Sequence, residues 1–274
     1  MFKEVMPNND IYVSRMEKSI LDKALFMSHV DADIIIDFGC ANGALIKFLS
    51  QIFPNKYYIG YDISNVMINK AKKNFGEDYE SLRIKFTTKW DDVMEYINKL
   101  KDADSRLKTC FVCSSVIHEV YAYGTEKEID LFWDRFWNSG FDYIAVRDMY
   151  RNYSSSYNWF YPKYVKELIR QSQYGHHYDQ FIERWGHMNT LNRFHHFFLK
   201  YFYTENWNRE LNEDYLPEDK RLHHMVDSSD FDVYETIFDI KYILPYIKER
   251  VKNDFGLEIY RPTHYQKILK LQKP

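Results

Sequence analysis

Residues 34–43 read Ile-Ile-Ile-Asp-Phe-Gly-Cys-Ala-Asn-Gly, and this stretch decides the fold. Its apolar run predicts a buried strand that ends in an acid, and a glycine-rich turn precedes an apolar-patterned helix that begins near Ala44. A glycine turn between a strand and a helix lets a ligand approach bare backbone at the helix N-terminus. The stretch therefore indicates a site for a nucleotide-containing cofactor.

Strands and helices alternate over residues 14–148. We predict strands at residues 33–38, 57–62, 82–86, 108–113 and 143–146, and helices at 14–30, 44–53, 64–75, 91–100 and 125–138. Strands separated by helices of this length predict a parallel sheet with helices on both faces. Two further strands are expected at 233–240 and 264–271, with a helix at 244–254 between them. The predicted fold class is α/β, with a doubly wound, mostly parallel seven-stranded sheet.

A helical insertion is expected after the fifth strand, because residues 150–230 lack strand signals and are rich in aromatic residues, His and Asn. Helices are predicted at 161–171 and 191–211, the second with a wide apolar face. We expect the insertion to form a lid at the ligand edge of the sheet. The predicted domains are a cofactor-binding core at residues 1–149, the insertion at 150–230, and C-terminal elements at 231–274 that complete the core sheet.

Composition limits the classes of function. The net charge of −3 gives no overall electrostatic footprint for nucleic acid. The three cysteines, Cys40, Cys110 and Cys113, are an odd number, which favours reduced thiols in a cytosolic protein. With neither a signal-peptide pattern nor an apolar run of membrane-spanning length, a soluble, cytoplasmic protein without a membrane partner is expected. The sequence predicts no particular oligomeric state.

No metal site is predicted. The pattern Cys110-x-x-Cys113 lies inside a strand, which points the two thiols to opposite faces. The insertion is rich in histidine, but no pair has i,i+4 spacing with a nearby third ligand. We expect those histidines to lie on the surface or to cap helices.

Polar residues end the predicted strands, at the edge where open parallel sheets bind ligands. Asp37 ends the first strand, Asp62 the second, Thr87-Thr88-Lys89 follows the third, Ser114 ends the fourth and Arg147-Asp148 the fifth. Asp62 lies about 20 residues beyond the glycine turn, the spacing of an acid that accepts hydrogen bonds from two ribose hydroxyls.

S-adenosylmethionine fits this pattern better than a dinucleotide does. The turn reads Gly39-x-Ala41-x-Gly43 and lacks the third glycine of a dinucleotide site. Asp37 would also repel a pyrophosphate, whereas it favours the ammonium and sulfonium groups of S-adenosylmethionine.

The chain resembles the class I S-adenosylmethionine-dependent methyltransferases. Residues 37–43 match the first motif of that family, residues 59–62 the second, and residues 111–120 the fourth, a strand and loop that contain His118. The resemblance covers residues 14–148 well and the final helix and strand moderately. Residues 150–230 have no counterpart.

The resemblance implies roles for individual residues. The turn holds the methionine portion of the cofactor, Asp62 binds the ribose, Ile63 lines the adenine, and Ser114 and His118 face the reactive methyl group. The turn residues concerned are Asp37, Gly39, Cys40, Ala41, Asn42 and Gly43. Ala41 replaces the usual middle glycine, which is tolerable if its φ stays negative. Thr88 or a neighbour replaces an acid near the adenine amino group, and Trp90 is a candidate to pack on the adenine.

On the acceptor side, the candidate catalytic residues are His118 as base or orienter, with Asp148 or Glu119 as its support. An oxygen or nitrogen acceptor can need such a base, although the sulfonium is already activated. The alternatives are that His118 fixes loop backbone and that Arg147 and Asp148 form a local ion pair.

The leading function is methyl transfer to an oxygen or nitrogen atom of a small molecule. The first alternative is methylation of RNA or a nucleotide, favoured by aromatic residues with basic ones in the insertion, at Arg151, Lys163, Lys166, Arg170, Arg184 and Arg193. The second is a non-catalytic binding subunit with the same fold, and the third, a nicotinamide-dependent oxidoreductase, is disfavoured by the missing glycine.

Overall fold

The computed structural model describes residues 19–76, 79, 83–152, 163–227 and 234–271. Its contacts divide the chain into two units. Unit 1 comprises residues 1–148, 229–239 and 266–274, and unit 2 comprises residues 149–228 and 240–265. We expected all of residues 231–274 to complete the core, whereas the contacts group residues 240–265 with the helices of unit 2.

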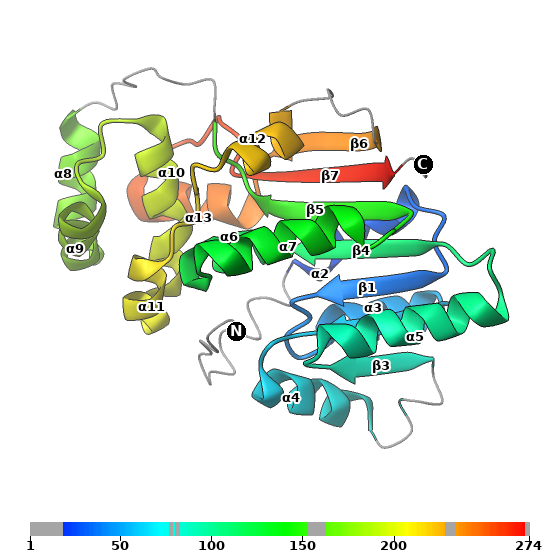
Figure 1. Cartoon of the computed structure of the whole chain (residues 1–274). Helices are drawn as coiled ribbons and strands as arrows, with labels where there is room; N and C mark the ends of the chain where they lie inside the picture. The colour runs from blue at the N-terminus through cyan, green and yellow to red at the C-terminus, as the bar shows by residue number, and fades with distance from the viewer. Residues whose placement is uncertain (1–18, 77–78, 80–82, 153–162, 228–233, 272–274) are drawn as a thin grey trace. The chain divides into compact units, whose positions relative to one another are not determined.

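The seven-stranded sheet confirms the predicted fold class (Figure 1). The order of the strands across the sheet is β3-β2-β1-β4-β5-β7-β6. The pairs β2–β3, β1–β2, β1–β4 and β4–β5 are parallel. The strands are β1 Ile34–Phe38, β2 Tyr57–Tyr61, β3 Ile84–Thr87, β4 Thr109–Ser114, β5 Tyr143–Met149, β6 Tyr234–Tyr242 and β7 His264–Leu271.

Strand β7 runs antiparallel to β5. The Leu271 N–H donates to Asp142 O just before β5, whereas the Tyr150 N–H just after β5 donates to Thr263 O before β7. The last strand of the chain is therefore inserted between β5 and β6.

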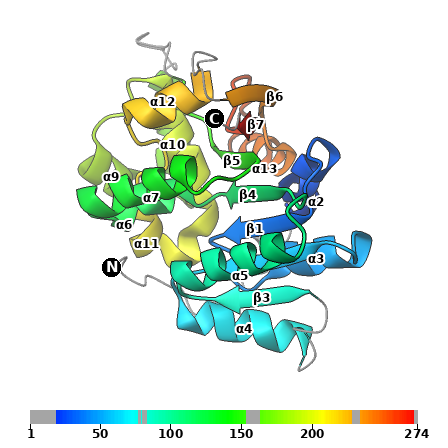
Figure 2. The same ribbon diagram turned by 45° about the vertical axis from the view of Figure 1, so that its right-hand side comes forward.

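Helices cover both faces of the sheet in unit 1. Figures 1 and 2 show α5 and α7 on one face and α3 on the other. The helices are α2 Ile20–Ala24, α3 Ala44–Ile52, α4 Asn65–Phe75, α5 Trp90–Ala103, α6 Ile117–Tyr123 and α7 Glu126–Asn138. Ser64 caps α4 by accepting from the Met67 N–H, and Thr125 forms a capping box with Glu128 at the start of α7. Helix α6 was not predicted.

Alternation of side chains along the buried strands gives each face its own core. On the α3 side, Ile35 packs with Leu45, Ile68 and Phe86 in one apolar cluster. On the α5 and α7 side, the core is aromatic, and Phe111 stacks on Phe141 with ring centroids 4.8 Å apart. Both faces of the sheet are thus buried, as a parallel sheet requires.

Unit 2 is helical and has its own aromatic core. Its helices are α8 Lys163–Gln171, α9 Gly175–Trp185, α10 Leu191–Lys200, α11 Trp207–Asn212, α12 Lys220–Asp227 and α13 Pro245–Phe255. The core includes Phe181, Phe197, Tyr201 and Phe255. The single helix predicted at 191–211 is wrong, because a 3₁₀ segment at Tyr201–Asn206 with a non-helical Tyr203 separates α10 from α11. Helices α9 and α12 were also missed.

None of the helices in the described part of the chain is long and apolar enough to cross a membrane.

Candidate functional site

The candidate site lies at the carboxyl ends of the strands in unit 1. Strand order reverses between β1 and β4, where Phe38 pairs with Tyr61 on one side and with Cys113 on the other. The residues that follow these strands therefore share one edge of the sheet. Ligands bind open α/β sheets at such a switch point.

The glycine turn is tied to the neighbouring strand through its backbone. The N–H groups of Gly39 and Cys40 both donate to Tyr61 O, at 2.8 and 3.0 Å. Gly39 has a φ of +77° and Gly43 a φ of +75°. A Cβ atom at Gly39 would lie 2.6 Å from Val116 Cγ2, so only glycine fits there.

Ala41 has a φ of +46°, so the expectation of a negative φ at this position is wrong. Its N–H donates to Asp62 Oδ2 at 2.9 Å, which offsets the cost of a left-handed alanine. The other carboxylate oxygen, Oδ1, accepts from the Ser64 N–H at 2.9 Å. Asp62 thereby joins the turn to the start of α4, and a carboxylate keeps lone pairs for further hydrogen bonds.

Asp37 is a buried carboxyl at the end of β1. Its side chain is 4% exposed and makes no hydrogen bond to a described residue. Burial raises the pKa of Asp37 to about 7, with Lys23 opposing the shift and Asp62 adding to it. A cationic ligand beside Asp37 would favour its ionised form.

Asn42 and Cys40 are held within the protein. Asn42 Oδ1 accepts from the Ala44 N–H at 3.3 Å, and Asn42 O accepts from Asn74 Nδ2 at 3.1 Å. Burial raises the pKa of Cys40, and all three cysteines are free thiols inside the core. These two side chains help to build the turn.

The end of β3 lacks an acid, as the sequence indicated. Thr87 Oγ1 donates to Asp92 Oδ2 at 2.7 Å, and Thr88 is half-buried beside it. Ile63 is 37% exposed next to Asp62, so it offers an apolar surface at this edge. Trp90 is engaged in the core instead, with its ring at an edge-on angle to Tyr61 and Phe111.

The structure brings together two of the three candidate catalytic residues. His118 Nδ1 lies 2.8 Å from Asp148 Oδ1, and both side chains are buried. Asp148 Oδ2 also accepts from the Ile117 N–H at 2.9 Å, which fixes the start of α6. Glu119 is half-buried on the same helix, and its charge acts on Lys23. Of the two candidates for supporting His118, Asp148 is the one whose contact with its ring the structure records.

Arg147 pairs with Asp22, and Asp148 with His118. Its guanidinium donates to Asp22 Oδ2 through Nε and to Ser115 Oγ through Nη1, both at 2.5 Å. Ser115 has a φ of +58°. The ion pair that the structure records for Arg147 is the one with Asp22, on α2. Asp22 and the neighbouring Lys23 were missed, because nothing local in the sequence connects them to β5.

Ser114 supplies a hydroxyl at the end of β4. Its Oγ is buried without a hydrogen-bond partner among the described residues. Buried hydroxyls are normally satisfied, so an unpaired one at a ligand edge needs an explanation. A bound ligand would supply its partner.

The histidines of unit 2 include two that are buried, His195 and His196. Burial lowers the pKa of His195 to about 4 and that of His196 well below its usual value. The expectation that these two lie at the surface or cap helices is therefore wrong. Within the described ranges, no three His, Cys, Asp or Glu side chains are grouped to hold a metal ion.

Comparison with protein families agrees with this geometry. Residues 35–123 match the family model for the methyltransferase domain. The match spans β1 to α6 and contains the glycine turn, Asp62 and His118. No curated protein matches the chain in sequence.

Solved structures of methyltransferases are similar over most of the chain. The methyltransferase domain of bacterial CtHen1-C has 13% identity and a TM-score of 0.48, over 94% of this chain and 99% of that chain. The plantazolicin methyltransferase BamL, in complex with a triazolic desmethylPZN analog and SAH, has 12% identity and a TM-score of 0.44, over 96% of this chain and 88% of that chain. A SAM-dependent methyltransferase from Archaeoglobus fulgidus has 16% identity and a TM-score of 0.42, over 95% and 100%.

Residues 35–123 match a methyltransferase domain, and the sheet that contains them has a doubly wound, Rossmann-like strand order. The cofactor that this domain match implies is S-adenosylmethionine. The unpaired Ser114 hydroxyl and the buried Asp37 carboxyl fit that cofactor.

Proposed function

We propose that the enzyme methylates an oxygen or nitrogen atom of a small molecule, with His118 and Asp148 handling the acceptor's proton. The buried hydrogen bond of 2.8 Å between His118 Nδ1 and Asp148 Oδ1 carries this proposal. A base oriented by a carboxylate suits an acceptor that loses a proton as it gains a methyl group.

The proposed cofactor site has two parts. Asp37 and the backbone of the turn from Gly39 through Cys40, Ala41 and Asn42 to Gly43 hold the methionine portion. Asp62 accepts hydrogen bonds from the ribose, Ile63 and Thr88 lie at the adenine, and the Ser114 hydroxyl faces the reactive end. The exposed Ile63 and the place of Asp62 between the turn and the start of α4 support these roles.

S-adenosylmethionine, when bound, supplies a methyl group already activated by its sulfonium. The chain then needs to align the acceptor and to remove its proton. Asp148 holds Nδ1 of His118 and thereby fixes the orientation of the ring, with Nε2 pointing away from Asp148. We assign to Nε2 the acceptance of the proton that the acceptor would lose when the methyl group passes to it from the cofactor's sulfur, which would depart as a neutral thioether.

A small molecule is favoured over RNA by the pairing of basic residues in unit 2. Of the residues considered for RNA, Arg151 pairs with Glu218 and Arg170 with Asp179. Arg184 lies over the Trp185 ring, 4.9 Å from its centroid. These contacts reduce the basic surface open to a polyanion.

The three buried free thiols favour a location in the reducing cytoplasm.

The test is methyl transfer from tritiated S-adenosylmethionine to separated metabolite, RNA and protein fractions. Label in the metabolite fraction, reduced in the His118→Gln variant, is the expected result. Label in RNA alone would overturn the small-molecule proposal. Binding of S-adenosylmethionine without transfer to any fraction would support the non-catalytic alternative.

A further inference from the structure

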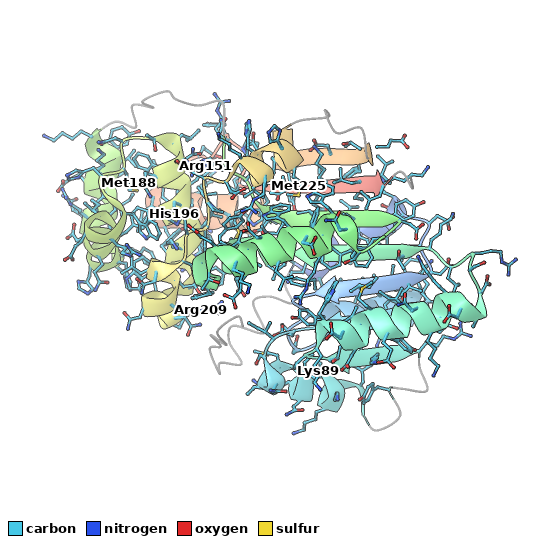
Figure 3. All side chains as sticks on the ribbon, in the orientation of Figure 1. Lys89, Arg151, Met188, His196, Arg209 and Met225 are labelled. Carbon is cyan, nitrogen blue, oxygen red and sulfur yellow. The ribbon has the colours of Figure 1, made fainter. Side chains whose placement is uncertain are left out.

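Unit 2 contains a cleft of about 610 Å³, and all of its lining residues belong to that unit. The volume is within the range of small-molecule sites. Arg151 and His196, both labelled in Figure 3, contribute to its lining, together with Trp185 from α9 and Arg193 from α10. Nothing in the methyltransferase domain match, which ends at residue 123, accounts for this cleft.

Arg193 is the cation available to a ligand here. Its guanidinium carbon lies 5.7 Å from the centroid of the Trp185 ring, and the guanidinium makes no hydrogen bond or ion pair with a described residue. A guanidinium presents a planar set of donors that matches a carboxylate in two parallel hydrogen bonds.

Three other polar side chains of the cleft are already engaged. Asn192 exchanges two hydrogen bonds with the backbone of Asn152. Thr190 caps α10 by accepting from the Arg193 N–H. Arg151 pairs with Glu218 and donates to Leu216 O. The architecture around Arg193 is therefore fixed, while its own donors remain available.

The charges of the lining favour a monoanion. Asp214 and Glu218 balance Arg151 and Arg193, and burial keeps the pKa of His196 low, so that the ring stays neutral. A phosphate dianion or a nucleic acid would be repelled by the two carboxylates of the same cleft. A ligand with a single carboxylate carries one negative charge, which the positive charge of Arg193 neutralises.

Trp185 supplies an aromatic wall beside Arg193. Its Nε1 donates to Leu211 O at 2.6 Å, and the His196 ring packs edge-on against it at 4.8 Å. The indole is thus held in place before a ligand arrives. We propose that this cleft binds a small aromatic carboxylate, with the carboxylate on Arg193 and the ring against Trp185. The proposal goes beyond the methyl transfer described above, because it does not require this ligand to be the methyl acceptor.

Calorimetric titration of the full chain with indole-3-acetate and with its neutral isostere indole-3-acetamide tests the proposal. We expect the carboxylate to bind about tenfold or more tightly than the amide, as a charged hydrogen-bond pair implies. Arg193→Gln should abolish this preference, and Trp185→Leu should weaken both ligands. Arg184→Gln is the matched control, since Arg184 also lies over Trp185 but does not line the cleft.

Absence of binding, equal binding of acid and amide, or an unchanged preference in Arg193→Gln would overturn the proposal. Tighter binding of phenyl phosphate would replace the carboxylate with a phosphate ligand and would also overturn it. Thermal unfolding of each variant checks that the fold is kept. Because the measurement is binding and not methylation, its outcome is independent of the proposed acceptor chemistry.

Discussion

The His118 imidazole and the Asp148 carboxylate are held 2.8 Å apart at the adjacent ends of β4 and β5. The same carboxylate accepts from the first N–H of α6, so one side chain orients both the ring and the helix that carries it. This double role makes Asp148 a positioning residue.

Asp148→Asn should lower the rate of methyl transfer on the order of a hundredfold, the lower range for general base catalysis. Asparagine keeps an acceptor for the backbone of α6 but no longer supports a charged imidazole. Cofactor affinity by calorimetry should change little. Glu119→Gln, which alters the other candidate for supporting His118, is the control. An equal loss of rate in both variants would contradict the His118–Asp148 assignment.

Asp62→Ala should weaken binding of S-adenosylmethionine by about tenfold or more, because hydrogen bonds to a charged acceptor contribute roughly 1–3 kcal/mol each. It also leaves the N–H groups of Ala41 and Ser64 without their acceptor, so the melting temperature should fall. Asp92→Asn, at the end of β3, is the control. Unchanged affinity in Asp62→Ala would mean that the turn has been misinterpreted.

The pKa of Asp37 predicts a loss of stability with rising pH. The unfolded chain releases this proton near pH 3.8, whereas the folded chain keeps it up to about pH 7. The folded state therefore binds more protons across this window, and the free energy of unfolding falls by at most about 4 kcal/mol as the pH rises. Lys23, whose pKa is lowered to about 8, acts only above that pH.

Asp37→Asn should therefore flatten the decline in melting temperature between pH 5 and about pH 7. Asp104→Asn should leave it unchanged, because Arg106 holds the pKa of the exposed Asp104 at about 2. Affinity for S-adenosylmethionine should also rise with pH through about 7 in the wild-type chain and not in Asp37→Asn. A pH-independent affinity in the wild type would place the cofactor's cations away from Asp37.

Ala41→Gly should raise stability by up to about 1 kcal/mol. Glycine removes the cost of a left-handed alanine, about 1–2 kcal/mol, but adds freedom to the unfolded chain. Ala44→Gly at the start of α3 should destabilise, since that residue is helical. Denaturant unfolding of both variants gives the comparison, and destabilisation by Ala41→Gly would contradict the observed φ.

Ser114→Ala should leave the unliganded fold equally stable or slightly more stable, because the hydroxyl is buried without a partner among the described residues. Cofactor affinity should fall by about fivefold to tenfold if that hydroxyl bonds the ligand. Reduced stability with unchanged affinity would instead assign Ser114 to the core.

The sequence was sufficient for the parts of the site whose chemistry is local. The strand, the glycine turn and the acid of the next strand follow one another, so Asp37, Gly39 and Asp62 could be recognised by spacing. The contact between Arg147 and Asp22 joins residues 125 positions apart, and no local pattern records it. The left-handed Ala41 escaped prediction for the same reason, because its hydrogen bond comes from Asp62 on the next strand.

In unit 2 the aromatic periodicity was recognised but its interruption was not. Phe194, Phe197 and Tyr201 continue a helical pattern, yet the helix ends at Lys200. The buried Lys200 ammonium donates to the carbonyls of Glu210 and Glu213, so the chain must fold back around it. That constraint comes from tertiary contacts, so the spacing of apolar residues in the sequence does not reveal it.

The placement of β7 between β5 and β6 has a consequence for synthesis of the chain. Strands β2 to β5 can pair as soon as they leave the ribosome, because each has a neighbour made earlier in the order β3-β2-β1-β4-β5. Strand β6 emerges before β7 and has no other neighbour, so it must wait without a strand partner until residues 264–271 arrive. During that interval β5 exposes an open edge, which is the condition under which newly made sheets aggregate or recruit chaperones.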